Sequence, residues 1–266
     1  MIPRALRRSH VLKHLGDKHP YARDLHVLGV VSSTSDLVLE RARTGATNGF
    51  VVAAQGQSEG RGRRGTHWTS PTRRGLWFSV LVAPPPQDRR LLSPAIGLAV
   101  ADAIGQLGMV AKLKWPNDVF LGSDKVAGCL VDLAEDQTGA PFAVVGVGIN
   151  THLDPADLPP DMAHPGTSLH AATGQDIDRE ALLASTLDAI AKWLEVAHAG
   201  NTDAIVEAWA PYDLLIGRTI TAVDGDLEVK GRVVAVDPIV GIHVDTGMGV
   251  QMLRSETTHV IATESA

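Results

Sequence analysis

The segment QSEGRGRRGTHW, residues 57–68, decides the fold class, because its pattern has two interpretations. Its glycines match G-x-G-x-x-G, which in dinucleotide-binding proteins joins a strand to a helix that opens directly after it. Arginines fill the variable positions here and Pro71 follows soon after, which does not fit the opening of a helix. We therefore predict a glycine-rich loop, and not the start of a doubly wound parallel sheet.

The same loop concentrates positive charge in an acidic chain. Five arginines and no acidic residue lie between residues 61 and 74, although the formal net charge of the 266 residues is −6. Guanidinium groups can hold carboxylates and phosphates through paired hydrogen bonds, and glycines let the backbone approach a ligand closely. Gln57 adds an amide suited to a urea-like group. The loop predicts a site for a small anionic ligand, with a solvated surface loop as the alternative.

Apolar runs around the loop predict an α+β domain with a mixed, largely antiparallel sheet. The runs at 126–133 and 142–149 are joined by the turn EDQTGAP, which indicates an antiparallel pair. The other predicted strands are 26–31, 50–54, 76–82 and 110–114, and the predicted helices are 32–43, 92–107, 178–198 and 202–212.

The pattern changes after residue 214. Short strands at 218–223, 227–236, 240–245 and 249–253 are broken by glycine, aspartate and proline, which fits a small β-barrel. We therefore predict a main domain of residues 1–214 and a small β-barrel domain of residues 215–266.

Composition narrows the class of protein. There is no run of 18 apolar residues, and the basic N-terminal segment lacks the apolar core of a secretory signal, so we expect an ordinary N-terminal helix and no membrane contact. Cys129 is the single cysteine, which excludes an intramolecular disulfide and a cysteine zinc cluster. We expect a protein of the reducing cytoplasm. The negative net charge argues against a general nucleic-acid binder.

Three further motifs follow predicted strands. In KWPND, residues 114–118, Lys114 could lie near phosphates, and Asn117 and Asp118 could either cap their own turn or bind magnesium on a nucleotide triphosphate. In KVAG, residues 125–128, small residues after Lys125 leave room for a bulky ligand. The motif GVGIN ends a strand at Asn150.

In their order and combination, these motifs resemble the biotin–protein ligase family. The resemblance covers roughly residues 27–260 and rests on S-T-x at 33–35, Q-x-x-G-R-G-R-R-G at 57–65 with Trp68, K-W-P-N-D at 114–118, K-x-A-G at 125–128 and G-x-G-I-N at 146–150. It implies a class II synthetase-like catalytic domain followed by an SH3-like β-barrel. It also implies a biotin–[acetyl-CoA-carboxylase] ligase, which makes biotinyl-5′-AMP from biotin and Mg·ATP and passes biotin to a lysine of a biotin carboxyl carrier domain.

The resemblance also implies roles for individual residues. The catalytic residues would be Lys125, Arg61 and Arg63. The biotin-binding residues would be Ser33, Thr34, Ser35, Gln57, Arg61, Gly62, Arg63 and Lys125. The ATP-binding residues would be Arg63, Trp68, Lys114, Asn117, Asp118 and Asn150, with Asn117 and Asp118 as magnesium ligands. This chain departs from the family at Ser35, where asparagine is usual, so that contact loses an amide donor.

Three alternatives remain open. A lipoate or octanoate ligase would share the activation chemistry, but the KWPND and GRGRRG segments favour biotin. A repressor would need a winged-helix domain, and only about 26 residues precede the first predicted core strand. A non-catalytic biotin-binding module would leave the phosphate-directed residues unused. We expect a monofunctional ligase without a DNA-binding domain, present as a monomer or weak homodimer, whose partners are biotin, ATP and the carrier domain of an acyl-CoA carboxylase.

Overall fold

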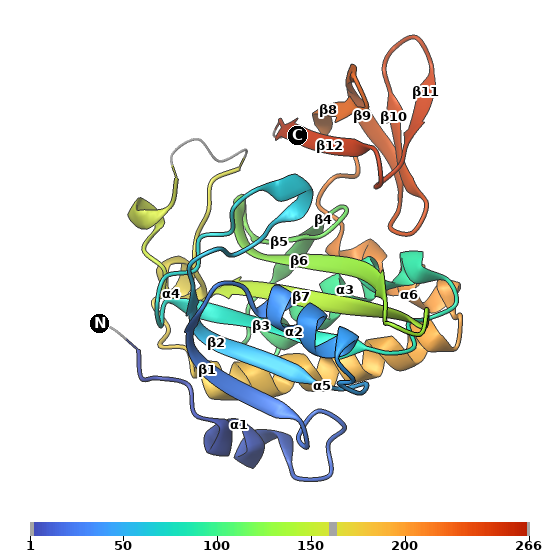
Figure 1. Ribbon diagram of the computed structural model, residues 1–266. Helices are drawn as coiled ribbons and strands as arrows, with labels where there is room; N and C mark the ends of the chain where they lie inside the picture. The colour runs from blue at the N-terminus through green and yellow to red at the C-terminus, as the bar shows by residue number, and fades with distance from the viewer. Residues whose placement is uncertain (1–2, 160–163, 265–266) are drawn as a thin grey trace.

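The computed structural model describes residues 3–159 and 164–264 and contains two β-sheets with helices around the larger one (Figure 1). The helices are α1 (Arg8–Leu15), α2 (Thr34–Arg43), α3 (Leu92–Gly105), α4 (Leu169–Thr173), α5 (Arg179–His198) and α6 (Thr202–Trp209). The strands of the larger sheet are β1 (Leu25–Val31), β2 (Val51–Gln57), β3 (Gly75–Val82), β4 (Ala111–Lys114), β5 (Asp118–Leu121), β6 (Asp124–Glu135) and β7 (Pro141–Asn150).

The larger sheet is mixed, as predicted. Its strand order is β1-β2-β3-β7-β6-β5-β4, in which β1 and β2 are parallel and all other neighbours are antiparallel. The predicted pair of β6 and β7 is confirmed, with Cys129 opposite Val147. Because β3 is antiparallel to both β2 and β7, the C-terminal ends of β2 and β7 lie beside the N-terminal end of β3, on the same side of the sheet.

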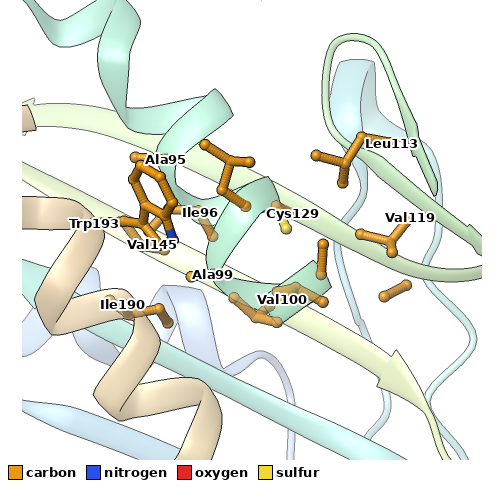
Figure 2. Close-up of a cluster of buried hydrophobic side chains, with 14 of the residues drawn as sticks. Ala95, Ile96, Ala99, Val100, Leu113, Val119, Cys129, Val145, Ile190 and Trp193 are labelled. Carbon is orange, nitrogen blue, oxygen red and sulfur yellow. The ribbon is translucent and has the colours of Figure 1, made fainter. Parts of the chain in front are cut away.

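Both faces of the sheet are covered, which explains why its central strands are apolar throughout. Val51 and Ala53 of β2 belong to the core cluster that contains side chains of α3 and α5, whereas Val52, with Phe50 just before the strand, belongs to the cluster that contains side chains of α2. This alternation follows from the two-residue period of a strand. Figure 2 shows the larger core, where side chains of α3 and α5 meet Cys129 of β6 and Val145 of β7.

The predicted small barrel is a five-stranded antiparallel sheet at the C-terminal end of the chain (Figure 1). Its strands are β8 (Thr219–Asp224), β9 (Leu227–Asp237), β10 (Gly241–Asp245), β11 (Val250–Leu253) and β12 (Thr258–Thr263), in the order β11-β10-β9-β8-β12. The boundary predicted at residue 214 falls between this sheet and the turn after α6. A hydrogen bond from the Leu214 backbone N–H to the Leu113 carbonyl, 3.0 Å, ties that turn to β4.

Some elements differ from the sequence prediction. Asp118 belongs to β5, a strand where we predicted only a turn, because the turn is completed by residues 115–117. Gln57 closes β2 and so lies at a strand end, not within the loop. Helix α4 and strand β12 were not predicted, and β12 mixes polar and apolar residues without a clear run. Among the described residues, no helix combines the length and apolar character needed to cross a membrane.

Candidate active site

A cavity of about 670 Å³ lies where the glycine-rich loop, the start of α2 and strands β4–β7 meet the C-terminal sheet. All but one of the residues predicted for the site line this cavity. They are Ser33, Thr34, Ser35, Gln57, Arg61, Gly62, Arg63, Trp68, Lys114, Asn117, Asp118 and Lys125. The exception is Asn150, which is buried at the end of β7. Segments up to 92 residues apart in sequence, from Ser33 to Lys125, thus converge on one site.

One end of the cavity is lined by neutral polar groups. Ser33 caps α2 by accepting a hydrogen bond of 3.3 Å from the Asp36 N–H. This cap places Thr34 and Ser35 in the first turn of the helix. The Oε1 atom of Gln57 accepts from the Thr34 N–H at 2.8 Å and from its Oγ1 at 3.1 Å.

Ser79 joins these groups and was missed by sequence reasoning. Its Oγ lies 2.8 Å from Thr34 Oγ1 and 3.0 Å from Ser35 Oγ, and its side chain is fully buried within β3. The available signal was a single hydroxyl in the otherwise apolar run of that strand, since buried hydroxyls require partners. We call Thr34, Ser35, Gln57 and Ser79 the hydroxyl end of the cavity.

Two glycines of β7 let side chains of the site lie directly against the sheet. A Cβ atom built on Gly146 would lie 2.6 Å from Ser35 Oγ, and one on Gly148 would lie 2.4 Å from Trp68 Nε1. Neither distance is tolerable between non-bonded atoms, so a side chain at either position would displace Ser35 or Trp68. Trp68 therefore lies directly against the sheet, and its ring is 5.1 Å from the Lys125 Nζ.

The two arginines predicted to be catalytic have different surroundings. Arg61 is partly exposed and pairs with two carboxylates, Asp36 at 3.0 Å and Asp132. Arg63 is more buried and donates through Nη2 to the Ser255 carbonyl at 2.6 Å. Burial lowers the pKa of Arg63, and the neighbouring Arg64 lowers it further. Arg61 is thus paired directly with acids. Arg63 instead hydrogen-bonds to a backbone carbonyl in the turn between β11 and β12, while Asp118 and Glu256 favour its charged form from a greater distance.

The opposite end of the cavity is cationic, and we call Arg63, Lys114, Asp118 and Lys125 its charged end. The Lys125 Nζ lies 2.8 Å from Asp118 Oδ1. Lys114 is buried, and its Nζ donates to the Val260 carbonyl at 3.3 Å. Burial lowers the pKa of Lys114 to about 8. Burial opposes ionisation of Asp118, but Lys125 and Lys114 outweigh it and the pKa of that carboxyl is lowered.

Asn117 and Asp118 can supply only part of a magnesium site. Asn117 donates through Nδ2 to the Cys129 carbonyl at 2.8 Å, which leaves its Oδ1 facing Arg63 at 3.5 Å. Across the residues that the structure describes, no group of three or more histidine, cysteine or acidic residues is placed to hold a metal ion. Magnesium usually binds one or two protein oxygens and completes its shell with phosphate oxygens and water. These two side chains fit that pattern, with phosphate as the main ligand.

Asn150 lies close to the cavity without lining it. Its Nδ2 donates to the Thr167 carbonyl at 3.0 Å, while its buried Oδ1 has no hydrogen-bond partner in the described part of the chain. An unpaired buried acceptor is costly. Asn150 Oδ1 is therefore available to accept a hydrogen bond from a bound ligand or water.

Sequence reasoning also missed the far wall of the cavity. Thr258, His259 and Val260 of β12 line it together with His164, which follows the undescribed residues 160–163. Burial lowers the pKa of His164 to about 4, helped by Lys114, so this ring is neutral at physiological pH. Its Nε2 is buried and unpaired within the described residues. The C-terminal sheet is thus part of the site.

Cys129 is a core residue, as predicted, and lies among the buried side chains of Figure 2. It is also one of the residues that line the cavity. Burial raises the pKa of its thiol to about 12. A thiol with that pKa is protonated and not nucleophilic at neutral pH. Cys129 is therefore not prepared to act as a nucleophile.

Comparison with known proteins agrees with the geometry. The model of the Biotin/lipoate A/B protein ligase family matches residues 27–150. The Biotin--[acetyl-CoA-carboxylase] ligase of Paracoccus denitrificans is 33% identical over 219 residues, which are 79% of this chain and 90% of that protein. The Bifunctional ligase/repressor BirA of Bacillus subtilis is 28% identical over 229 residues, covering 85% of this chain and 70% of the relative.

A solved structure shares the fold across almost its whole length. The biotin protein ligase from Aquifex aeolicus in complex with biotin and ATP is 28% identical, with a TM-score of 0.77 over 90% of this chain and 98% of that one. The predicted α+β fold is confirmed by this likeness. With a relative matched over nine tenths of its length at 33% identity and with this fold, the chain belongs to the biotin–protein ligase family of enzymes.

Proposed function

We propose that this protein joins biotin to AMP, using ATP, and then transfers the biotin to a lysine of a biotin carboxyl carrier domain of an acyl-CoA carboxylase. The observation that carries the proposal is the contrast within one cavity: neutral hydrogen-bonding groups at one end and three cations against one carboxylate at the other. A ligand with a neutral polar ring and an anionic tail matches this contrast.

The hydroxyl end receives the ureido ring. Thr34 and Ser35 offer oxygen atoms to ring N–H groups, and Gln57, whose Oε1 already accepts twice from Thr34, holds Thr34 in place. Gly146 leaves the Ser35 oxygen accessible to the ring. The valeryl chain then runs beneath Trp68 toward Lys125. Lipoate and octanoate carry no ring N–H, so they would bury apolar groups against these oxygens, which favours biotin over both acids.

The charged end receives the phosphates of ATP. The first step brings the biotin carboxylate, an anion, against the α-phosphate, another anion. Lys125 and Arg63 lie where they offset this repulsion and stabilise the charge that develops as the carboxylate oxygen bonds to phosphorus and pyrophosphate leaves. When bound, magnesium supplies further positive charge to the phosphates, held by Asn117 and Asp118.

The unpaired Asn150 Oδ1 supports a place for the nucleotide base nearby. An adenine amino group is a donor that a carboxamide oxygen can accept. In the second step the lysine amine of the carrier attacks the acyl carbon, and AMP leaves. The buried, protonated Cys129 takes no part in either step. We place the reaction in the cytoplasm.

Mass spectrometry of a purified carrier domain tests the proposal directly. Incubation with this protein, biotin and Mg·ATP should add one biotinyl group to the carrier, and omission of biotin, ATP or metal should each abolish the product. A carrier whose target lysine is replaced by arginine is the control. Full biotinylation without ATP, or no product with all components, would contradict the proposal.

A second experiment separates the proposal from its nearest alternative. Exchange of labelled pyrophosphate into ATP reports acid activation without any carrier. Biotin should drive this exchange, whereas lipoate and octanoate at equal concentration should not. Exchange driven by lipoate alone would assign the protein to the other branch of its family.

A further inference from the structure

Three hydroxyl groups and one amide form an unbranched chain of hydrogen bonds under the cavity. Ser35 Oγ contacts Ser79 Oγ at 3.0 Å, Ser79 Oγ contacts Thr34 Oγ1 at 2.8 Å, and Thr34 Oγ1 contacts Gln57 Oε1 at 3.1 Å. Gln57 Nε2 continues the chain to Ser70 Oγ at 2.9 Å. Ser79 links Ser35 to Thr34, is fully buried, and is not among the residues that line the cavity.

The orientation of the Gln57 amide is determined by a backbone group. The Thr34 N–H can only donate, so the Gln57 atom 2.8 Å from it must be the oxygen and not the nitrogen. Gln57 Nε2 then donates to Ser70 Oγ, which passes its own proton to the Trp68 carbonyl at 3.0 Å. Every bond on this side of Gln57 is consistent with that orientation.

The Gln57 orientation propagates through the hydroxyl groups. Because Gln57 Oε1 can only accept, the contact with Thr34 Oγ1 is a hydrogen bond only if Thr34 donates its single hydroxyl proton to it. Thr34 Oγ1 must then accept from Ser79, and Ser79 Oγ must accept from Ser35. This is the one assignment in which all three contacts are hydrogen bonds, since each hydroxyl has a single proton to donate.

The direction of the chain decides what the cavity offers to a ligand. Ser35 gives its proton to Ser79, so both of its lone pairs remain for the cavity. Thr34 gives its proton to Gln57 and retains one lone pair. The hydroxyls of Thr34 and Ser35 therefore present acceptors and no donor to the cavity. A Cβ on Gly146 would lie 2.6 Å from Ser35 Oγ, so the glycine preserves access to this oxygen.

We propose that Ser79 is a positioning residue which, without touching the ligand, orients the Ser35 and Thr34 hydroxyls so that the site selects a ring N–H and rejects a ring oxygen in its place. The inference rests on the proposed biotin-ligase function and adds the specificity of its ring subsite. It also gives a reason why serine works at position 35, where the family usually has asparagine: the chain makes this hydroxyl a pure acceptor.

The test compares biotin with its two cyclic carbamate isosteres, in each of which one ring N–H is replaced by oxygen. Wild-type protein should bind biotin at least about 10³-fold more tightly than one of the isosteres, because sites built around a hydrogen bond discriminate strongly against ligands lacking it. In Ser79→Ala, the Ser35 hydroxyl loses its acceptor and can turn to donate to the ring oxygen. The preference for biotin over that isostere should fall by at least about tenfold.

Calorimetric dissociation constants for the three ligands give the preference directly, and thermal melting reports the fold. Thr186→Val is the matched control, since Thr186 is a buried hydroxyl on α5, bonded to the Leu182 carbonyl, and does not line the cavity. The preference of the Thr186→Val variant for biotin over the isostere should equal that of the wild-type protein. If Ser79→Ala does not fold, Ser79→Cys replaces it, because a thiol is a weak donor and acceptor of similar size and should also reduce the preference.

The outcomes are separable from those of the proposed function. Failure of the wild-type protein to bind biotin would overturn the function itself. Biotin binding with no discrimination against either isostere, or with the same preference in the folded Ser79 variant as in wild type, would overturn only the role of Ser79. A reduced preference confined to the Ser79 variant supports it.

Discussion

The two ends of the cavity satisfy their polar groups in opposite ways. At the hydroxyl end, Thr34, Ser35, Gln57 and Ser79 are neutral and bonded to one another. At the charged end, one carboxylate faces three cations, and burial that lowers the pKa of Lys114 from 10.5 to about 8 costs the protonated form ~3 kcal/mol. The polar groups of the hydroxyl end are hydrogen-bonded to one another without a ligand. The charged end has an excess of positive charge until an anionic ligand binds. Changes at the charged end should therefore affect the chemical step, and changes at the hydroxyl end should affect ligand choice.

The largest effect is expected for Lys125→Ala. Lys125 is the cation nearest to both Trp68 and Asp118, and its loss removes charge where the transition state becomes more negative. Loss of one such group commonly lowers the rate by about 10²–10³. Pre-steady-state formation of biotinyl-5′-AMP should show this decrease, with unchanged thermal melting as the control for folding. A rate within about threefold of wild type would contradict the assignment of the chemical step to the charged end.

Thr34→Val should produce a smaller and different effect. The substitution keeps the shape of the side chain but removes the hydroxyl that links Gln57 to Ser79. Leaving a buried polar group unpaired should weaken biotin binding by about 10- to 100-fold. Steady-state kinetics should show a raised KM for biotin with the KM for ATP unchanged. An equal rise in both constants would remove the distinction between the ends.

The pH dependence examines the charged end without mutation. In the free enzyme, rising pH removes the proton of Lys114 near its pKa of about 8, so kcat/KM for ATP should fall above that pH. The fall should be limited to about tenfold, because Arg63 and Lys125 keep part of the positive charge. Lys114→Arg should move the fall to higher pH. A profile that is flat between pH 7 and 9.5 would show that Lys114 does not contribute charge to ATP binding.

The smallest effect is expected for Asp132→Asn, since Asp132 is in contact with the site only through Arg61. The carboxylate pairs with Arg61, but both side chains are partly exposed and Asp36 also holds the guanidinium at 3.0 Å. Ion pairs of this kind contribute at most about 1 kcal/mol. The KM for biotin should change by less than about threefold. A change above tenfold would identify the release of Arg61 as a step that limits ligand entry.

Sequence reasoning predicted the site better where its signals are local. The helix predicted at 32–43 corresponds to α2, and the apolar runs of β6 and β7, with the turn between them, predict their own pairing. The short strand β5 was missed because its four residues are too few to show a period. The convergence of the motifs on one cavity was expected from the family resemblance, and not from the spacing of the residues.

What could not be predicted depends on contacts between distant residues. Arg63 is 192 residues from Ser255, and Ser79 is 44 residues from Ser35. A serine within an apolar strand has the same sequence signal whether its hydroxyl faces another strand or a functional side chain. The two acids that pair with Arg61 are likewise unmarked in the sequence, since α2 and β6 are adjacent to the loop only after the sheet has formed.

The carbonyls of Ser255 and Val260, which hold Arg63 and Lys114, have a consequence for synthesis of the protein. These two residues are synthesised after every strand of the larger sheet and after β8–β11. The nascent chain therefore lacks the C-terminal wall of the cavity until synthesis is nearly complete. A premature stop codon anywhere between residues 215 and 254 would spare all of the motifs that resemble the family and still leave the site without its far wall. In genetic terms, such late truncations should behave as complete loss-of-function alleles.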